Sequence, residues 1–182
     1  DKAQTITSTV AIPMYARSAS NIRDHRHVTS LLHRTFTVKN GIMIYPTLTF
    51  DERGHNKNKI FYGALAKEEV NGEMVSPVSF CPVTEEFIGR GGNFENPYYV
   101  VKNQPLPYKA GEEVDGYETV AAIRFADCTL EPGETRTYIV ALGYGESEAE
   151  ITELSKKYLI KKHFDKYLEE TKEFWQEKIN VS

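Results

Sequence analysis

Apolar and polar residues alternate with a period of two through the first three quarters of the chain, and turn residues interrupt the alternation at short intervals. The pattern is clear in TITSTVAIP at 5–13, HVTSLLHRTFTV at 27–38 and TRTYIVALGYG at 135–145. The Asn-Gly pairs at 40–41 and 71–72 favour tight hairpin turns. About seven strands joined by turns predict a mainly β, antiparallel sandwich.

The period changes at Ser147. Ser147 and Glu150 have the spacing of a capping box, which marks the start of a helix. Further on, Phe164, Leu168, Thr171 and Trp175 recur at helical spacing and form one stripe. We therefore expect a β-sandwich domain over residues 1–146 and two helices within 147–182, whose apolar stripe is buried against the sandwich or against a neighbouring domain.

Residues 84–117 show little periodicity but contain six aromatic side chains, which predicts that this segment packs on the sandwich. Its Gly-rich stretch GRGGNF, residues 89–94, lacks the Lys-Ser/Thr ending of a phosphate-binding loop. The glycines therefore indicate a loop with unusual backbone angles. The adjacent acids Glu85 and Glu86, like Asp51 and Glu52, are typical of solvated loop residues.

Composition excludes several functions. The formal net charge is -4 and the basic residues form no long block, which argues against nucleic-acid binding. No apolar run approaches the roughly 20 residues of a membrane span. Cys81 and Cys128 match no zinc or redox spacing, so we expect two free thiols in the cytoplasm.

The chain opens on Asp1, already in a strand-like pattern, and we expect a piece of a longer protein that begins inside the sandwich.

The densest cluster of charge and imidazole is RDHRH, at the start of the second strand segment: Arg23, Asp24, His25, Arg26 and His27. Three interpretations stay open. Two histidines at i and i+2 on a strand could share a metal with His33 or His55, although a nearby arginine opposes this. The cluster could be a solvated corner, or a polar network at a ligand or domain boundary, where arginine and histidine suit hydroxyl-rich or anionic partners.

Three longer motifs resemble one known family. These are IPMYARSASNIRDHRHVTSLLHR at 12–34, YPTLTFDERGHNKN at 45–58 and EEFIGRGGNFENPYYV at 85–100. They resemble the amino-terminal sandwich of glycoside phosphorylases of glycoside hydrolase family 94, formerly glycosyltransferase family 36. The likeness is greatest to 1,2-β-oligoglucan phosphorylases and cyclic β-1,2-glucan synthases, and it covers nearly the whole chain.

The resemblance implies a galactose-mutarotase-like β-supersandwich, followed by linker helices that lead into an (α/α)6 catalytic barrel. In the family the catalytic aspartate lies in that barrel, and inorganic phosphate is the co-substrate. No residue here matches that acid, so the resemblance implies a non-catalytic domain, inactive alone, without cofactor or metal. Its partners would be a β-linked glucan, the barrel of the same protein and a second copy in a homodimer. The candidate substrate or domain-interface residues are Arg23, Asp24, His25, Arg26, His27, Arg90 and Asn93.

Two alternatives come from other functional classes. The chain could be a stand-alone carbohydrate-binding or structural module. It could also be a mutarotase-like epimerase, which needs a histidine general acid and a glutamate base facing one cleft. The sequence offers only His25 or His27 with Glu85 or Glu86 for that pairing.

Overall fold

The computed structural model describes residues 2–16, 32–47 and 60–179. Within these ranges every strand pairing is antiparallel. The strands are β1 (Gln4–Ile6), β2 (Thr9–Met14), β3 (His33–Val38), β4 (Gly41–Pro46), β5 (Phe61–Val70), β6 (Glu73–Val75), β7 (Ser79–Val83), β8 (Thr119–Arg124), β9 (Cys128–Leu130) and β10 (Thr137–Gly145). The helices are α2 (Thr84–Ile88), α3 (Tyr98–Val101), α4 (Glu148–Tyr158) and α5 (Lys161–Ile179).

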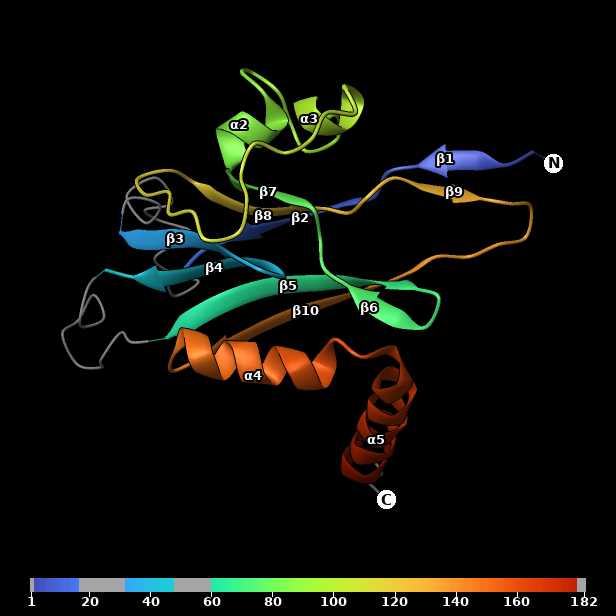
Figure 1. Cartoon of the computed structure of the whole chain (residues 1–182). Helices are drawn as coiled ribbons and strands as arrows, with labels where there is room; N and C mark the ends of the chain where they lie inside the picture. Colours follow the sequence, from blue (N-terminus) through green and yellow to red (C-terminus); the bar gives the residue numbers. More distant parts are fainter. Residues whose placement is uncertain (1, 17–31, 48–59, 180–182) are drawn as a thin grey trace.

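Two sheets face each other and make a sandwich, as the sequence predicts. The larger sheet has the order β10-β5-β4-β3, with β6 added to β5, and the smaller has the order β2-β8-β7. A separate two-stranded ribbon of β1 and β9 extends from the body (Figure 1). Helices α2 and α3 cover the outer face of the smaller sheet, and α4 lies under the larger one (Figure 1). The chain is therefore layered, with the helices on opposite outer faces.

Three apolar clusters hold these layers together. The cluster between the sheets includes Ile42, Ile44 and Ile123, all fully buried. A second cluster joins the outer face of the larger sheet to α4, and a third joins the smaller sheet to the segment that follows β7. Because central strands contact a layer on both faces, all six residues of β8 are buried.

The strand predicted over residues 5–13 is in fact two strands. β1 pairs with β9, whereas β2 pairs with β8, so the chain changes sheets at Thr7 and Ser8. The Ser8 carbonyl accepts a hydrogen bond from the Phe125 amide at 3.0 Å, which anchors the crossing point. Pro13 is tolerated because β2 is an edge strand of its sheet. A second break separates β8 from β9, and the short β6 follows the Asn71–Gly72 turn, so the described ranges contain ten strands where about seven were expected.

The two Asn-Gly pairs behave differently. Asn71 and Gly72 both have positive φ, 52° and 84°, and form the predicted hairpin turn between β5 and β6. The prediction of a turn at Asn40–Gly41 is wrong by one residue, because Val38 pairs with Gly41, which is the first residue of β4. Glycine is required there by close approach: a Cβ on Gly41 would press on the Ala64 carbonyl oxygen and lie 2.9 Å from Leu65 Cα.

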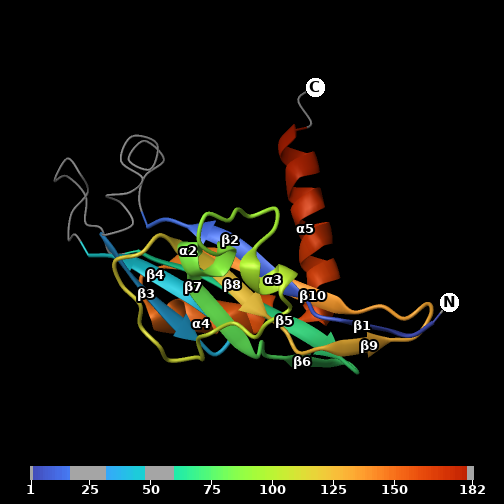
Figure 2. The same ribbon diagram turned by 90° about the horizontal axis from the view of Figure 1, so that it is seen from above.

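The two C-terminal helices form where the sequence predicts them. Ser147 caps α4 by accepting a hydrogen bond from the Glu150 amide at 3.2 Å. Ile151 is buried against the larger sheet, so α4 is held to the sandwich. Helix α5 has no buried residue and projects from the body (Figure 2). Its stripe is exposed, with Phe164 at 52% and Trp175 at 56%.

Replacing Trp175 with alanine is expected to cost less than about 1 kcal/mol of unfolding free energy in a monomeric chain, because the side chain is already half in water. Urea unfolding followed by circular dichroism measures this. A loss of roughly 3–5 kcal/mol, typical of a buried aromatic, would show that the indole is packed in solution.

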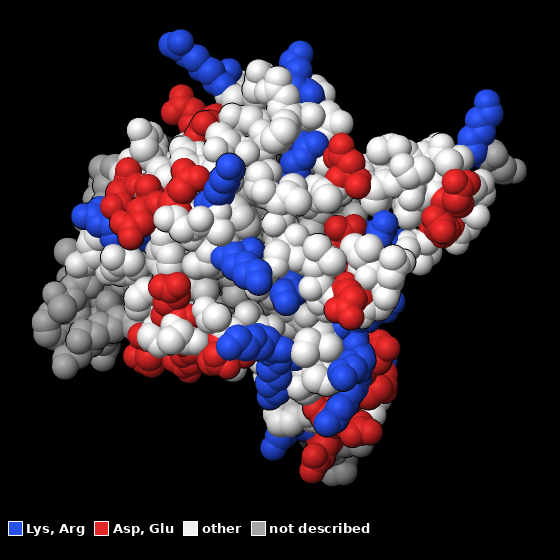
Figure 3. Space-filling view, in the orientation of Figure 1, with Lys and Arg blue, Asp and Glu red and all other residues white. Residues whose placement is uncertain are grey.

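The charged surface is mixed. On the face shown in Figure 3, lysine and arginine side chains are interspersed with aspartate and glutamate, without a continuous basic surface. Among the described ranges, no helix is both long enough and apolar enough to cross a membrane.

Candidate functional site

The candidate residues predicted from the sequence fall in two places. Arg23, Asp24, His25, Arg26 and His27 lie outside the described residues, as does His55, so their geometry stays untested. Arg90 and Asn93 lie in the segment between α2 and α3, on the outer side of the smaller sheet. The described part of the site is therefore built around that segment.

Glycines shape the turn after α2. Gly89 ends the helix with φ 83°, and a Cβ there would lie 2.8 Å from the Cβ of Tyr98. A Cβ on Gly92 would press on the Ile88 carbonyl oxygen. The predicted unusual backbone is confirmed, and its consequence is that Tyr98 can sit directly against the end of α2.

Arg90 and Asn93 have different roles in this turn. Both side chains are exposed. The Asn93 Oδ1 atom accepts hydrogen bonds from the amides of Glu95 and Asn96, each at 3.0 Å, so it stabilises the local turn. Arg90 instead is one of the residues that line a cavity.

The cavity has a volume of about 460 Å³ and lies beside α2 and α3. Its wall combines four tyrosines with two carboxylates and one arginine. The lining residues are Val83, Glu85, Glu86, Gly89, Arg90, Tyr98, Tyr99, Tyr108 and Tyr117. We call this set the tyrosine pocket. The rings of Tyr98 and Tyr117 are 42% and 54% exposed, so they can contact a ligand from outside.

One hydrogen bond orders the floor of the tyrosine pocket. The Tyr108 hydroxyl donates to Glu86 Oε2 at 3.0 Å. Burial raises the pKa of Tyr108, and the hydrogen bond to Glu86 raises it further. Burial also raises the pKa of Tyr99, and the negative charge of the Glu86 carboxylate raises it further. Both hydroxyls therefore stay protonated at neutral pH, and Tyr108 occupies one of the two oxygens of Glu86, a residue that lines the cavity.

The pocket rests on rigid supports. Phe87 and Leu106 are buried on the outer face of the smaller sheet together with Cys81. Burial raises the pKa of the Cys81 thiol to about 12, so this thiol is inert. The buried Arg124 donates from Nη1 to the Gln104 carbonyl and from Nη2 to Asn103 Oδ1, both at 2.7 Å. The segment 84–117 is thus packed only in part: Phe87 and Leu106 are buried, whereas Phe94, Tyr98 and Tyr117 are exposed. The segment also contains the short helices α2 and α3, which the sequence did not indicate.

His33, a suggested third metal ligand, lies elsewhere. It is 1% exposed, and its Nε2 atom is 2.8 Å from the Thr119 hydroxyl, which is 2.8 Å from that of Thr35. Burial lowers the pKa of His33 to about 4, despite partly opposing contributions from Asp115 and the Tyr117 backbone. Within the described ranges, no three His, Cys, Asp or Glu side chains converge as metal ligands.

The arrangement in the tyrosine pocket suits a flat ligand that carries many hydroxyl groups. Tyrosine faces pack on C–H surfaces, carboxylates accept hydrogen bonds from hydroxyls, and a guanidinium donates them. Sequence reasoning identified Arg90 but not the pocket around it, because Glu85 and Glu86 were interpreted as solvated and Tyr108 is distant in the chain. The sequence signal that could have pointed to this pocket is the concentration of aromatic residues between 84 and 117.

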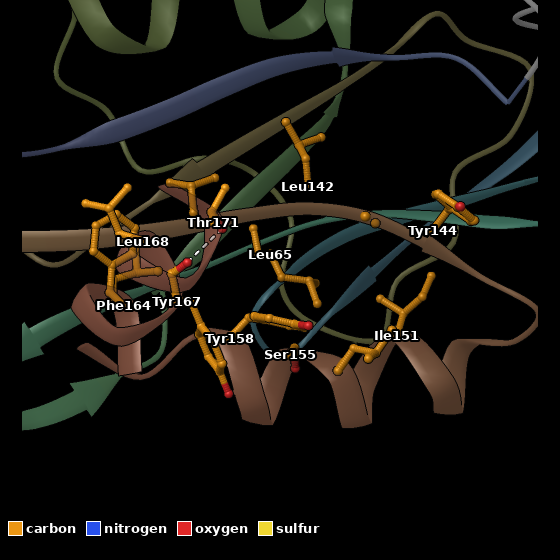
Figure 4. Close-up of a pocket in the computed structure, with 16 residues that line it drawn as sticks. Leu65, Leu142, Tyr144, Ile151, Ser155, Tyr158, Phe164, Tyr167, Leu168 and Thr171 are labelled. Carbon is orange, nitrogen blue, oxygen red and sulfur yellow. Dashed lines mark hydrogen bonds between the residues drawn. The ribbon is translucent and has the colours of Figure 1, made fainter. Parts of the chain in front are cut away.

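A second cavity of about 490 Å³ lies on the opposite side of the domain, between β10 and helices α4 and α5. Its lining is almost entirely apolar and contains no charged side chain. This cavity (Figure 4) offers the hydroxyls of three tyrosines, Ser155 and Thr171 but no carboxylate and no guanidinium, so it is the poorer candidate for binding a hydroxyl-rich ligand.

Comparison with known proteins gives one match. The family model described as glycosyl hydrolase 94, supersandwich domain, matches residues 1–160, a range that includes every described strand and α4. A search of curated proteins finds none that matches.

Proposed function

Because this chain belongs to the glycosyl hydrolase 94 supersandwich domain family, we propose that it is a non-catalytic, carbohydrate-associated domain of a β-glucan phosphorylase-like protein. The tyrosine pocket carries this proposal. Its exposed tyrosines, Tyr98 and Tyr117, line the same cavity as two carboxylates and one arginine, which together offer a pyranose ring stacking faces and hydrogen-bond partners.

The proposal has further parts that rest on the family and on the sequence motifs. The parent protein would join residues 1–146, through the helical segment 147–182, to an (α/α)6 barrel that supplies the catalytic acid and uses inorganic phosphate. Its substrate would be a β-linked glucan of the 1,2 type. The two free, buried thiols favour a cytoplasmic protein. The domain would then support glucan binding, domain packing or dimer formation, and not bond cleavage.

Purified chain is expected to bind β-1,2-linked glucooligosaccharides weakly, and Tyr98→Ala or Tyr117→Ala should weaken binding by about twofold to tenfold. A stacked aromatic contact contributes roughly 0.5–1.5 kcal/mol, and 1.4 kcal/mol corresponds to tenfold. Titration calorimetry measures the dissociation constants. Cellooligosaccharides in a parallel titration report whether the pocket discriminates the linkage.

The matched control is Phe174→Ala, which removes an aromatic ring of similar exposure, 50%, from α5. This variant should bind as the wild type does. Equal losses in Tyr98→Ala, Tyr117→Ala and Phe174→Ala would contradict a specific pocket. Absence of binding by the wild type would leave the structural module as the better description of the chain.

The epimerase alternative requires a histidine general acid and a glutamate base that face one cleft. Glu85 and Glu86 line the tyrosine pocket, but the histidine partners it requires, His25 and His27, lie outside the described residues. Accelerated conversion of α-glucose to β-glucose, followed by polarimetry, would favour that alternative. Release of glucose 1-phosphate from glucan and phosphate by the purified chain would contradict the non-catalytic proposal.

A further inference from the structure

The chain contains two Asn-Gly pairs, Asn40–Gly41 and Asn71–Gly72, and the fold holds them in opposite ways. An asparagine followed by glycine is especially prone to spontaneous deamidation, because glycine has no side chain to hinder attack by its amide nitrogen on the asparagine side chain. The attack needs a backbone that can rotate and a side chain that is free. Whether each pair can react in the folded chain therefore depends on its exposure and on its hydrogen bonds.

The pair Asn71–Gly72 is free on these counts. Both residues are exposed at the tip of the hairpin that joins β5 to β6 (Figure 1). Val70 pairs with Glu73, so the two residues alone form the turn. Among the described residues, none forms a hydrogen bond with the Asn71 side chain. A Cβ built on Gly72 would meet no heavy atom within 4 Å, so the space around the attacking nitrogen is open.

The turn can also open at low cost. Asn71 and Gly72 have φ 52° and 84°, a tight conformation in which the backbone must rotate before the Gly72 nitrogen reaches the Asn71 side chain. This rotation separates β6 from β5. Strand β6 has three residues, and in the described ranges it pairs only with β5. Short pairings at the border of a sheet open locally with much less free energy than global unfolding requires.

The tertiary structure locks the other pair. Gly41 is buried in the larger sheet, where β4 pairs with β3 on one side and with β5 on the other. The Asn40 Oδ1 atom accepts a hydrogen bond from the Ser76 hydroxyl at 2.8 Å, and the Asn40 carbonyl accepts one from the Ala66 amide at 2.7 Å. Rotation at this position would break two strand ladders, so attack requires the larger sheet to unfold.

Asp115–Gly116 is a third pair that could form the same ring, because an aspartate side chain reacts in the same way but more slowly. Both of its carboxylate oxygens are engaged. Oδ1 accepts a hydrogen bond from the Thr35 amide at 3.2 Å, and Oδ2 lies 3.3 Å from the Arg34 Nε atom. Of the three pairs, Asn71–Gly72 is thus the one whose reacting side chain has no partner among the described residues.

We propose that Asn71 is a deamidation site of the folded chain, whereas Asn40 stays intact. The Gly72 amide nitrogen loses its proton to a base and forms a bond to Asn71 Cγ. The bond between Cγ and Nδ2 then breaks, and the side-chain nitrogen takes up a proton and leaves as ammonia. Water adds to one of the two carbonyl carbons of the resulting succinimide ring and opens it. Opening at one carbon gives aspartate, and opening at the other gives isoaspartate.

Either product changes the hairpin. Aspartate adds a negative charge next to Glu73. Isoaspartate adds one carbon to the backbone of a two-residue turn, which disturbs the pairing of Val70 with Glu73. The neighbouring Met74 packs against the cluster that joins the larger sheet to α4. The reaction therefore alters charge and backbone at a strand that contributes to this cluster.

Incubation of the purified full chain in mildly alkaline buffer, below its unfolding temperature, tests the proposal. Brief digestion with trypsin separates the pairs, because residues 68–90 contain Asn71 and residues 40–53 contain Asn40. Mass spectrometry should find an amide replaced by a carboxylate in the 68–90 peptide at least about tenfold faster than in the 40–53 peptide. In concentrated urea, which removes the protection by the fold, both peptides should convert at similar rates.

Asn71→Gly is the matched variant, since glycine adopts the positive φ of this turn without strain. Isoelectric focusing of the incubated wild type should show an acidic band that grows with time and that the variant lacks. Three outcomes would overturn the proposal: equal conversion of the two peptides in the folded chain, an unchanged 68–90 peptide in a chain that converts in urea, or equal acidification of Asn71→Gly. None of these readouts depends on glucan binding.

Discussion

Replacing Gly41 with alanine will destabilise the domain by more than roughly 3 kcal/mol, beyond the usual cost of overpacking a core. Gly41 is the first residue of β4 and pairs with Leu65 of the neighbouring strand β5. The added Cβ would press on the Ala64 carbonyl oxygen and lie 2.9 Å from Leu65 Cα. Both are backbone atoms of a central strand, so no side-chain rotation relieves the clash and the two strands must separate.

Gly143→Ala is the matched control. Gly143 lies in the same sheet, on β10, and a Cβ there would meet no heavy atom within 4 Å. Alanine at this position should change stability by less than about 1 kcal/mol. Urea unfolding compares the variants, and the soluble fraction after expression is the readout if Gly41→Ala does not fold. Similar stability of the two variants would show that β4 and β5 are farther apart in solution.

Acidification will reduce the stability of the wild type through His33. Burial lowers the pKa of His33 from 6.5 to about 4, so between these values the unfolded chain binds a proton that the folded chain excludes. The free energy of unfolding therefore falls as pH drops. The His33 contribution between pH 7.5 and 4.5 is about 2–3 kcal/mol, which follows from linkage at roughly 1.4 kcal/mol per pKa unit.

The measurement compares urea unfolding of wild type and His33→Gln at both pH values. Glutamine does not titrate, so the variant should lose the His33 part of the pH dependence while contributions from all other groups stay the same. His163→Gln, on α5, is the matched substitution of a histidine outside the core. An unchanged pH dependence in His33→Gln would mean that the imidazole is hydrated in the folded chain.

Part of the candidate site could be anticipated from local sequence. The glycines between Gly89 and Gly92 indicated an unusual backbone, and the aromatic content of 84–117 indicated packing. The hydrogen bond from Tyr108 to Glu86 could not be anticipated, because 22 positions separate the two residues in the chain. The β-bridge between Tyr108 and Phe80 brings Tyr108 to the smaller sheet, beside Glu86. Arg90 was identified from the family motif. Only the fold shows that Arg90 lines the tyrosine pocket.

The sequence by itself determined the elements that depend on neighbours along the chain. Period-two alternation predicted the strands, the Asn71–Gly72 pair predicted a hairpin, and Ser147 predicted the start of α4, because each signal acts over a few bonds. The tertiary structure alone decided which strands share a sheet and which edges stay open. Alternation predicts that one face of β10 is apolar. Whether Leu142 is covered depends on how far the opposite sheet extends, and residues distant in the chain determine the extent of that sheet.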